Sequence, residues 1–297
     1  MSDDAETGAT RTDGGVATDT DRTGTQGRDW NLVTRASTAG YRLAYLSVFV
    51  FLLAPVVVVA ATSLSDANTV AFPPSGLSLR WYGALLASGP WIEATRNSLL
   101  IATGTALLST TLGVAGALGT RKLDGKLADF VTGIAVVPLL VPGVVLGVTL
   151  LIFFSEFGLQ QEPATIVLAH SLWATPLTYS VMRATFSRYD WHVRDAALDL
   201  GASRLRAFRE VVAPNVAAGL AAATLIAFVV SLQEFVMTLF LSGRGSRTVP
   251  VKAWNSLRNS LDPLVSVTST LLVVVVLLVL LAAGVAVGLD RVARDAG

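Results

Sequence analysis

Six long apolar stretches dominate the pattern of hydrophobic and polar positions along the chain. None contains Asp, Glu, Lys or Arg, and they cover residues 43–65, 97–120, 130–155, 163–182, 211–233 and 263–289. A bilayer core of about 30 Å is crossed by a helix of about 20 apolar residues. Because backbone groups inside hydrocarbon must be satisfied within the segment, each stretch is expected to be a helix. The pattern predicts an all-α membrane protein with six transmembrane helices, and six such runs argue against buried helices of a soluble protein.

Prolines interrupt several of these spans. They are Pro55 in the first span, Pro138 and Pro142 in the third and Pro176 in the fourth. Proline removes a backbone hydrogen bond and kinks a helix, so kinked spans are expected. Gly143 and Gly147 form a pair of small residues that lets a neighbouring helix approach closely. Kinked and closely packed helices suit a moving pathway, although ordinary bundle packing is the alternative.

Charge fixes the expected orientation of the spans. Only 14% of the residues are charged and 53% are hydrophobic, whereas soluble domains have about 25% charged residues. With six spans and both termini in the cytoplasm, 16 Lys and Arg fall on the inner side and 6 on the outer side, which agrees with the positive-inside rule. The external loop at 243–262 holds four of those six and is expected to fold over the pore mouth.

The first 35 residues are different in kind from the rest. They are rich in Thr, Asp and Gly and contain almost no apolar residues. Such a segment cannot bury enough apolar surface to offset the entropy of ordering, so a disordered cytoplasmic tail is expected. It has no apolar run typical of a cleavable signal peptide. The sequence is therefore divided into a tail at 1–35 and a membrane domain at 36–297.

The connection between the fourth and fifth spans, residues 187–214, has the most informative pattern. It contains DAALDLGASRLRAFREVVAP over 195–214, which predicts a short helix, a glycine and a second short helix. Asp195 is expected in the first turn, where a carboxylate complements the helix dipole. Gly201 suits the end of the first helix, and Ser203 suits the N-cap of the second. A basic connector that merely obeys the charge rule is the alternative.

This loop resembles EAA-x3-G-x9-I-x-L-P, the signature of permease subunits of binding-protein-dependent ABC importers (the MetI-like transmembrane domain). Ala196, Ala197, Gly201 and Pro214 are identical to the signature, whereas Asp195, Val211 and Ala213 replace Glu, Ile and Leu. The resemblance implies that this loop forms coupling helices that seat in a cleft of an ATPase subunit. It also implies the other partners of such a system: a second homologous permease, an external solute-binding protein and the lipid bilayer.

A wider resemblance covers roughly residues 77–290. The run SLQEFVMTLFLSG at 231–243 resembles a segment of the C-type permease of spermidine/putrescine importers. This likeness implies a polyamine as the solute. Importers of ferric iron, thiamine and phosphonate share much of the pattern, and Gln233 stands where the polyamine branch usually has Asp, so these solutes stay open as alternatives.

Glu234 is the carboxylate that stands inside a long apolar run. An ionisable residue within a membrane span is a functional candidate by default. It follows Pro214 by 20 residues, which is about 30 Å at about 1.5 Å per residue and places it toward the outer half of the membrane. With Gln233 and Ser231 it is expected to line the path of a cationic solute. The alternative is a structural pair with Lys252, Arg258 or a cation of the partner permease.

Several kinds of chemistry lack the residues they need. Gly119–Lys126 has five residues between its glycines, and Leu127 stands where a phosphate loop needs Ser or Thr to bind magnesium. We therefore expect no ATP site, no catalytic residues and no cofactor in this chain. It has no Cys and two His, which argues against a metal site, and its basic loop lacks the aromatic residues of a nucleic-acid surface. The alternative class is an ATP-independent secondary transporter or channel, which should show inverted repeats.

Overall fold

The computed structural model describes residues 22–123 and 125–295. Within these residues the chain is helical, and the only β contacts are isolated bridges between Ser65 and Leu77 and between Gln161 and Ser242. Two units, Met1–Val57 and Val58–Gly297, are each compact in themselves and are described separately. The described residues thus confirm the predicted all-α fold, with helices long and apolar enough to cross a membrane.

Helix α1, Arg22–Ser63, forms the described part of the first unit and continues into the second. From Gly40 to Ser63 it is apolar and long enough to cross a membrane. The helix begins at Arg22, whereas a disordered tail was expected up to residue 35. The physical reason is that an existing helix extends at little cost, since nucleation is the unfavourable step. Residues 1–21 of the predicted tail lie outside the described residues.

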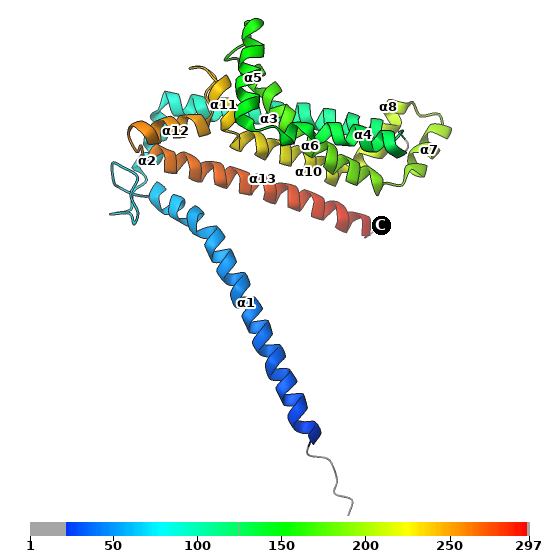
Figure 1. Cartoon of the computed structure of the whole chain (residues 1–297), viewed down its shortest axis with the longest axis horizontal. Coiled ribbons are helices and arrows are strands. Elements are labelled where there is room, and N and C mark those ends of the chain that lie inside the picture. Colours follow the sequence, from blue (N-terminus) through cyan, green and yellow to red (C-terminus); the bar gives the residue numbers. More distant parts are fainter. Residues whose placement is uncertain (1–21, 124, 296–297) are drawn as a thin grey trace, which may run out of the picture. The chain divides into compact units, whose positions relative to one another are not determined.

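The second unit is built around a bundle of long helices, which Figure 1 shows running side by side. Its members are α3 (Gly89–Thr120), α6 (Pro163–Ser187), α10 (Ala217–Gln233) and α13 (Leu264–Asp295). Small residues bring α3 against α6. A Cβ added to Gly113 would lie 2.3 Å from Thr178 Oγ1, and one on Gly116 would lie 3.2 Å from the Tyr179 ring. Gly104 of α3 meets Val167 of α6 in the same way, at 3.1 Å.

The predicted third span, 130–155, is two helices and not one kinked helix. Helix α4 (Gly125–Val136) continues into the short 3₁₀ turn η1 (Val137–Leu140), and α5 (Gly143–Glu156) follows at an angle of 92°. Pro138 lies in η1 and Pro142 precedes α5, so two missing amide donors fall at the break. The expected close contact at the glycine pair is confirmed: a Cβ on Gly143 would lie 3.1 Å from Trp173, and one on Gly147 would lie 2.9 Å from Phe240.

A second sharp bend lies inside the predicted fifth span, 211–233, which is therefore not one straight helix. Helix α8 (Arg204–Ala207), the π-helix η2 (Phe208–Val212) and α9 (Ala213–Asn215) lead to α10, and the direction changes by 82° at Val216. The described residues contain three helices long and apolar enough to cross a membrane by themselves, or up to five if each bent pair counts as one span. The helix α6 covers the fourth predicted span, but six spans stay a prediction.

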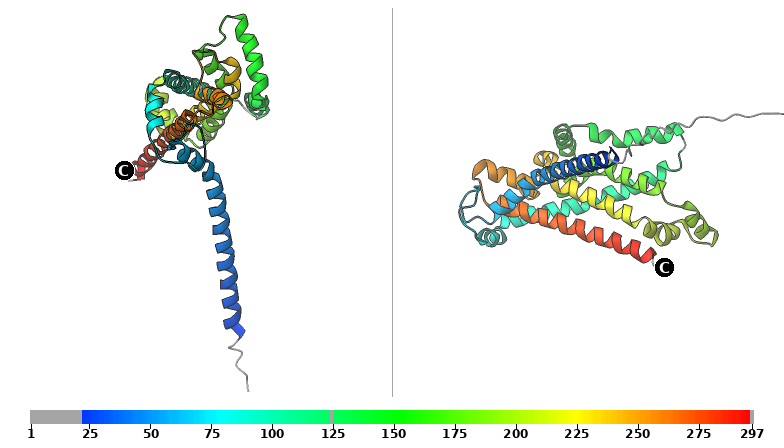
Figure 2. Two further views of the ribbon diagram at one scale, coloured as in Figure 1. Left: turned by 90° about the vertical axis from the view of Figure 1, so that its left-hand side faces the viewer. Right: turned by 90° about the horizontal axis from the view of Figure 1, so that it is seen from below.

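The shorter helices lie at the two ends of the bundle. Helices α2 (Arg80–Ala87), α11 (Val236–Leu241) and α12 (Val249–Asn259) gather at one end. Helix α7 (Trp191–Asp199), together with α8 and the last described residues of α13, lies at the other end. The views of Figures 1 and 2 agree on this separation. The loop that follows α3 and the loop that follows α6 therefore share one end of the bundle.

Candidate functional site

The first candidate site is the predicted helix–glycine–helix connection between α6 and α10, residues 187–214, which we call the elbow. Its first helix, α7, begins at Trp191 because the side chain of Asp190 caps it and accepts a hydrogen bond from the His192 amide at 3.0 Å. Asp195 therefore lies in the second turn and not in the first turn, where we expected it. Its carboxylate is exposed and stands 3.7 Å from the guanidinium of Arg194. Asp190, which the sequence pattern did not single out, holds the position of the capping acid.

The first helix ends where the sequence predicted. Gly201 has φ of +90°, a conformation that residues with a Cβ rarely adopt. The Ala202 amide donates to the carbonyl of Ala197 at 3.0 Å and the Gly201 amide donates to Leu198 at 2.9 Å, which is the Schellman arrangement. No heavy atom lies within 4 Å of where a Cβ of Gly201 would be. The glycine is therefore required by the backbone and not by crowding.

The second helix begins at the predicted cap and returns to the bundle. The Ser203 hydroxyl accepts a hydrogen bond from the Arg206 amide at 3.3 Å. Val211 accepts through its carbonyl from the Asn215 side chain at 2.8 Å, and Pro214 lies in the next turn. Val212 is fully buried in the apolar cluster that also holds Phe186 of α6. The elbow is thus anchored at both ends, with its turn projecting.

Exposed apolar side chains occupy this projecting part. Leu200 is 90% exposed and Leu205 is 66% exposed, while Ala196 beside them is also exposed. Sequence reasoning missed these two leucines because a leucine in a short amphipathic helix is ordinarily assigned to the core. Such a tip of small and apolar groups can enter an apolar groove on another protein.

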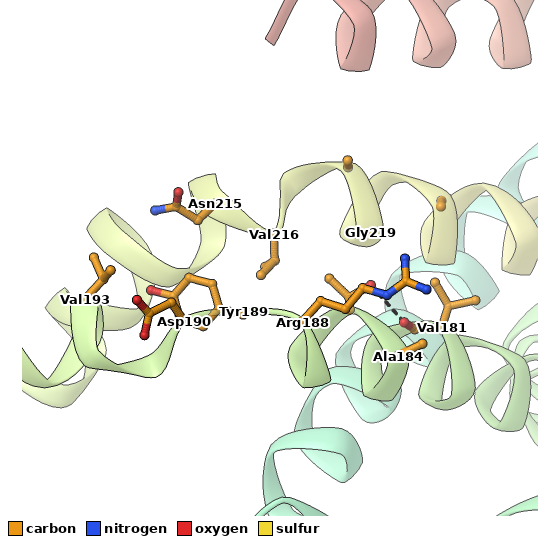
Figure 3. A pocket seen from close by; sticks show the side chains of 12 residues that line it. Val181, Ala184, Arg188, Tyr189, Asp190, Val193, Asn215, Val216 and Gly219 are labelled. Atoms are coloured by element: carbon orange, nitrogen blue, oxygen red, sulfur yellow. Dashed lines mark hydrogen bonds between the residues drawn. The ribbon is translucent and has the colours of Figure 1, made fainter. Parts of the chain in front are cut away.

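A cavity of about 600 Å³ lies behind the elbow, between the end of α6 and the start of α10. Figure 3 shows Val216 pointing across it toward the segment that holds Arg188 and Tyr189. Partial burial, and then the nearby negative charge of Asp190, raise the pKa of Tyr189. The cavity gives the start of α10 room to approach α6.

The second candidate site is a buried polar network around Glu234. This residue ends α10, and only 7% of it is exposed. One carboxylate oxygen accepts from the Met237 amide at 2.8 Å, and the other accepts from the Thr238 amide and hydroxyl, both at 3.0 Å. Glu234 therefore caps the start of α11 with its side chain. This explains why the helix breaks at this point inside an apolar run.

His170 of α6 completes the network. Its Nε2 lies 3.3 Å from a carboxylate oxygen of Glu234 and 2.8 Å from the Thr238 hydroxyl, while its Nδ1 lies 2.7 Å from the Ser231 hydroxyl. Ser231 in turn donates to Thr105 of α3 at 3.2 Å. Four helices, α3, α6, α10 and α11, are joined by these side chains. His170 was visible only as one polar residue in the fourth span, because its partner is 64 positions away.

The three residues expected to line a path do not lie together. Ser231 and Glu234 are buried in the network, whereas Gln233 is exposed and lines a second cavity, of about 460 Å³, between α10, α12 and α13. Among the described residues, His170 is the basic residue whose side chain lies within 4.0 Å of the Glu234 carboxylate. The two cations predicted as alternative partners of Glu234 lie over aromatic rings instead: Lys252 over Trp91 and Arg258 over Trp254.

A family model described as the binding-protein-dependent transport system inner membrane component matches residues 109–294. The chain belongs to this family. The match covers the elbow and, apart from Thr105, the Glu234 network, and it confirms the function predicted from the signature loop: the chain is a permease component of an ABC importer. Membership of a family of inner membrane transport components, together with several apolar helices, makes it a multi-pass membrane protein.

Curated relatives cover most of the permease. The spermidine/putrescine transport system permease protein PotC of Escherichia coli (strain K12) is 23% identical over 80% of this chain and 89% of its own length. The putrescine transport system permease protein PotI of the same strain is 29% identical over 75% and 82%. The molybdate/tungstate transport system permease protein WtpB of Pyrococcus abyssi is 28% identical over 70% and 76%.

Solved structures of importers share the fold. A bacterial ABC transporter involved in the import of the acidic polysaccharide alginate has a chain with a TM-score of 0.66 and 16% identity, covering 89% of this chain and 98% of that one. The MetNI methionine ABC transporter in an inward-facing conformation has a chain with a TM-score of 0.50 and 16% identity, covering 71% and 99%. At this identity the likeness concerns the fold alone.

Proposed function

We propose that this permease imports a polyamine of the spermidine or putrescine class. The observation that carries the proposal is the similarity to two polyamine permeases over three quarters or more of the chain and over 82–89% of their lengths. Ferric iron, thiamine and phosphonate stay as alternatives from the sequence pattern, and molybdate or tungstate is added by the relative from Pyrococcus abyssi.

The elbow is proposed to be the surface that receives the ATPase. Asp195, Ala196, Ala197, Gly201, Ser203, Val211 and Pro214 would build it. The exposed tip at Leu200 supports this role, because it offers apolar surface that nothing among the described residues covers. Gly201 and Ser203 hold the two short helices at a fixed angle, so a push on the tip reaches α6 and α10. We propose that nucleotide is hydrolysed on that separate subunit and that this chain has no ATP site and no catalytic residues.

We further propose six spans with both termini in the cytoplasm. The shared end of the bundle at which the elbow and the loop after α3 lie is also where α13 ends. These three segments, 183–209, 121–126 and 291–294, hold 11 of the 22 Lys and Arg of the chain. The membrane domain at 36–297 would pair with a second homologous permease and receive its solute from an external binding protein, as the fold shared with solved importers suggests.

For the solute path, we propose that Gln233 faces the passing solute while Ser231 and Glu234 shape the wall behind it. Gln233 is the exposed member of the three, and its amide both donates and accepts hydrogen bonds. The carboxylate of Glu234 would then act on the solute through its negative potential and not by direct contact. This arrangement suits a cationic solute better than an oxyanion.

The test is uptake into proteoliposomes by the assembled importer, with its ATPase, second permease and binding protein. We expect uptake of labelled putrescine or spermidine that requires both ATP and the binding protein. Uptake of molybdate in place of polyamines would overturn the assigned solute. Uptake without any ATPase would overturn the importer mechanism in favour of a secondary transporter or channel.

A bulky replacement at the elbow tests the docking surface separately. Ala197→Trp adds a large ring to the face of α7 without touching the cap or the glycine. We expect loss of ATPase binding while the chain still inserts into the membrane. Leu257→Trp, at an exposed position at the opposite end of the bundle, serves as the control. Normal ATPase binding and uptake in Ala197→Trp would contradict the proposed docking surface.

A further inference from the structure

Trp191 stands at the junction of three elements at the elbow end of the bundle. It is the first residue of α7. Its indole Nε1 donates a hydrogen bond to the carbonyl of Phe186, near the end of α6, at 3.1 Å. Its ring packs against the rings of Phe186 and Tyr189, with centroids 5.6 Å and 4.9 Å apart. The root of α7 is therefore held to α6 by a hydrogen bond and by aromatic contacts.

The same ring is also held to α3. The guanidinium of Arg121 lies 3.6 Å from the centroid of the Trp191 ring. This distance is well inside the range of cation–π attraction, for which tryptophan is the best aromatic partner. Arg121 is the C-cap of α3, and its amide donates to Ala117 at 3.2 Å. The cation is thus fixed to the end of a long helix and does not sit on a free loop.

The rest of the elbow lacks such connections. Leu200, Ser203 and Leu205 are exposed, and Asp195 has an exposed carboxylate whose nearby cation is its own neighbour. The return of the elbow is buried at Val212, in the same apolar cluster that Trp191 packs against. A displacement of α7 therefore reaches α3 through the contact between Trp191 and Arg121. It reaches α6 through the same indole.

We propose that Trp191 is a positioning residue that transmits the ATPase-driven movement of α7 to α3, with Arg121 as its partner. This inference rests on the proposed function, in which the ATPase docks on the elbow. Docking of the ATPase needs the exposed tip of the elbow, around Leu200 and Leu205, whereas transmission needs the start of α7 at Trp191. A defect at the root should therefore leave ATPase binding intact and reduce the solute moved per ATP hydrolysed.

One variant removes the hydrogen bond of the indole and the other removes the Arg121 cation, while Arg194, whose guanidinium lies 5.7 Å from the ring centroid, is unchanged in both. Trp191→Phe keeps an aromatic ring but removes the Nε1 donor, and Arg121→Gln removes the cation but keeps a polar side chain of similar reach. Arg121 is exposed and so can be replaced without opening a cavity. Lys122→Gln is the matched control, because it removes a positive charge from the next, equally exposed position.

The experiment measures three quantities on the assembled importer in proteoliposomes: the amount of ATPase bound, the rate of ATP hydrolysis and the solute imported per ATP. We expect Arg121→Gln and Trp191→Phe to bind ATPase as the unaltered permease does. Solute imported per ATP should fall by about five-fold or more in Arg121→Gln, the lower end of typical coupling between sites. Lys122→Gln should not change this ratio. Combining Arg121→Gln with Trp191→Phe should lower the ratio little more than either variant alone does.

The failure of this inference can be told apart from failure of the proposed function. If Arg121→Gln and Trp191→Phe both bind ATPase and keep the normal ratio of solute to ATP, the transmission role is wrong while docking on the elbow stands. Cross-linking from Leu200 reports docking directly. If a cross-linker placed there does not reach the ATPase in an active importer, the proposed docking surface is wrong and the role of Trp191 falls with it.

Discussion

The carboxylate of Glu234 is predicted to be the main support of the helix break inside the membrane. In Glu234→Ala, the amides of Met237 and Thr238 lose acceptors at 2.8 Å and 3.0 Å, and His170 loses a charged partner at 3.3 Å. Loss of a helix cap costs about 0.5–2 kcal/mol, and each buried donor left without its acceptor costs about 1–3 kcal/mol. Because the effects share one carboxylate, we expect destabilisation by about 3–5 kcal/mol.

Two further variants divide this value. Glu234→Gln keeps the size of the side chain, and its carbonyl can still accept from one amide, but its NH₂ group faces a donor at the other. Such a mismatch costs about 1–3 kcal/mol. Gln233→Ala is the matched control, because the neighbouring side chain is exposed and a surface change of this kind stays within about 0.5 kcal/mol.

The assay is unfolding of the purified permease in mixed micelles, titrated with a denaturing detergent. It gives the free energy of unfolding of each variant relative to the unaltered chain. A double-mutant cycle with His170→Ala should give a coupling energy of about 0.5–3 kcal/mol between His170 and Glu234. If Glu234→Ala unfolds within about 1 kcal/mol of the unaltered chain, no more than one lost hydrogen bond would cost, the reasoning from this network is refuted.

Three other predictions follow from single positions. Gly113→Ala should destabilise by about 1–3 kcal/mol, because its Cβ would meet Thr178 Oγ1 at 2.3 Å; Gly119→Ala on the same helix has open space and should be neutral or slightly stabilising in the same unfolding titration. Gly201→Ala should cost about 1–2 kcal/mol of strain, since φ is +90°, and Gly201→Asn should cost less. Faster amide hydrogen exchange at the elbow would show this strain, whereas equal protection in both variants would contradict it. Tyr179→Phe removes the hydroxyl that bonds Thr132 at 2.8 Å and Thr120 at 3.2 Å and should cost about 1–2 kcal/mol; an unchanged midpoint of thermal unfolding would argue against this bond.

The helices could be located from the sequence because their cause is local. A run of apolar residues becomes a helix in hydrocarbon whatever its neighbours do, so the described helices cover the predicted stretches except at the breaks around residues 141–142 and 216. The end of α7 at Gly201 and the cap at Ser203 were predictable for the same reason. Each depends on residues within one turn of the position concerned.

The features that could not be predicted depend on competition or on distance. Asp195 and Asp190 both suit a helix start, and only the folded chain shows that Asp190 caps the Trp191 end. Prolines near 138–142 predicted a kink, but the size of the bend, 92°, depends on what α5 packs against. The partnership of His170 with Glu234 joins positions 64 apart, and no local pattern signals it.

Three glycines of α3 lie against α6: Gly113 has no room for a methyl group, and Gly104 and Gly116 would hold one only if the facing side chain shifted. They span 12 residues, or about 18 Å of helix at about 1.5 Å per residue. Backbones that pack this closely cannot easily slide past one another, so α3 and α6 should move as one rigid body during the transport cycle. Conformational change would then concentrate at the break around Pro138 and Pro142 and at the bend of Val216, which makes those two places the natural positions for reporter groups.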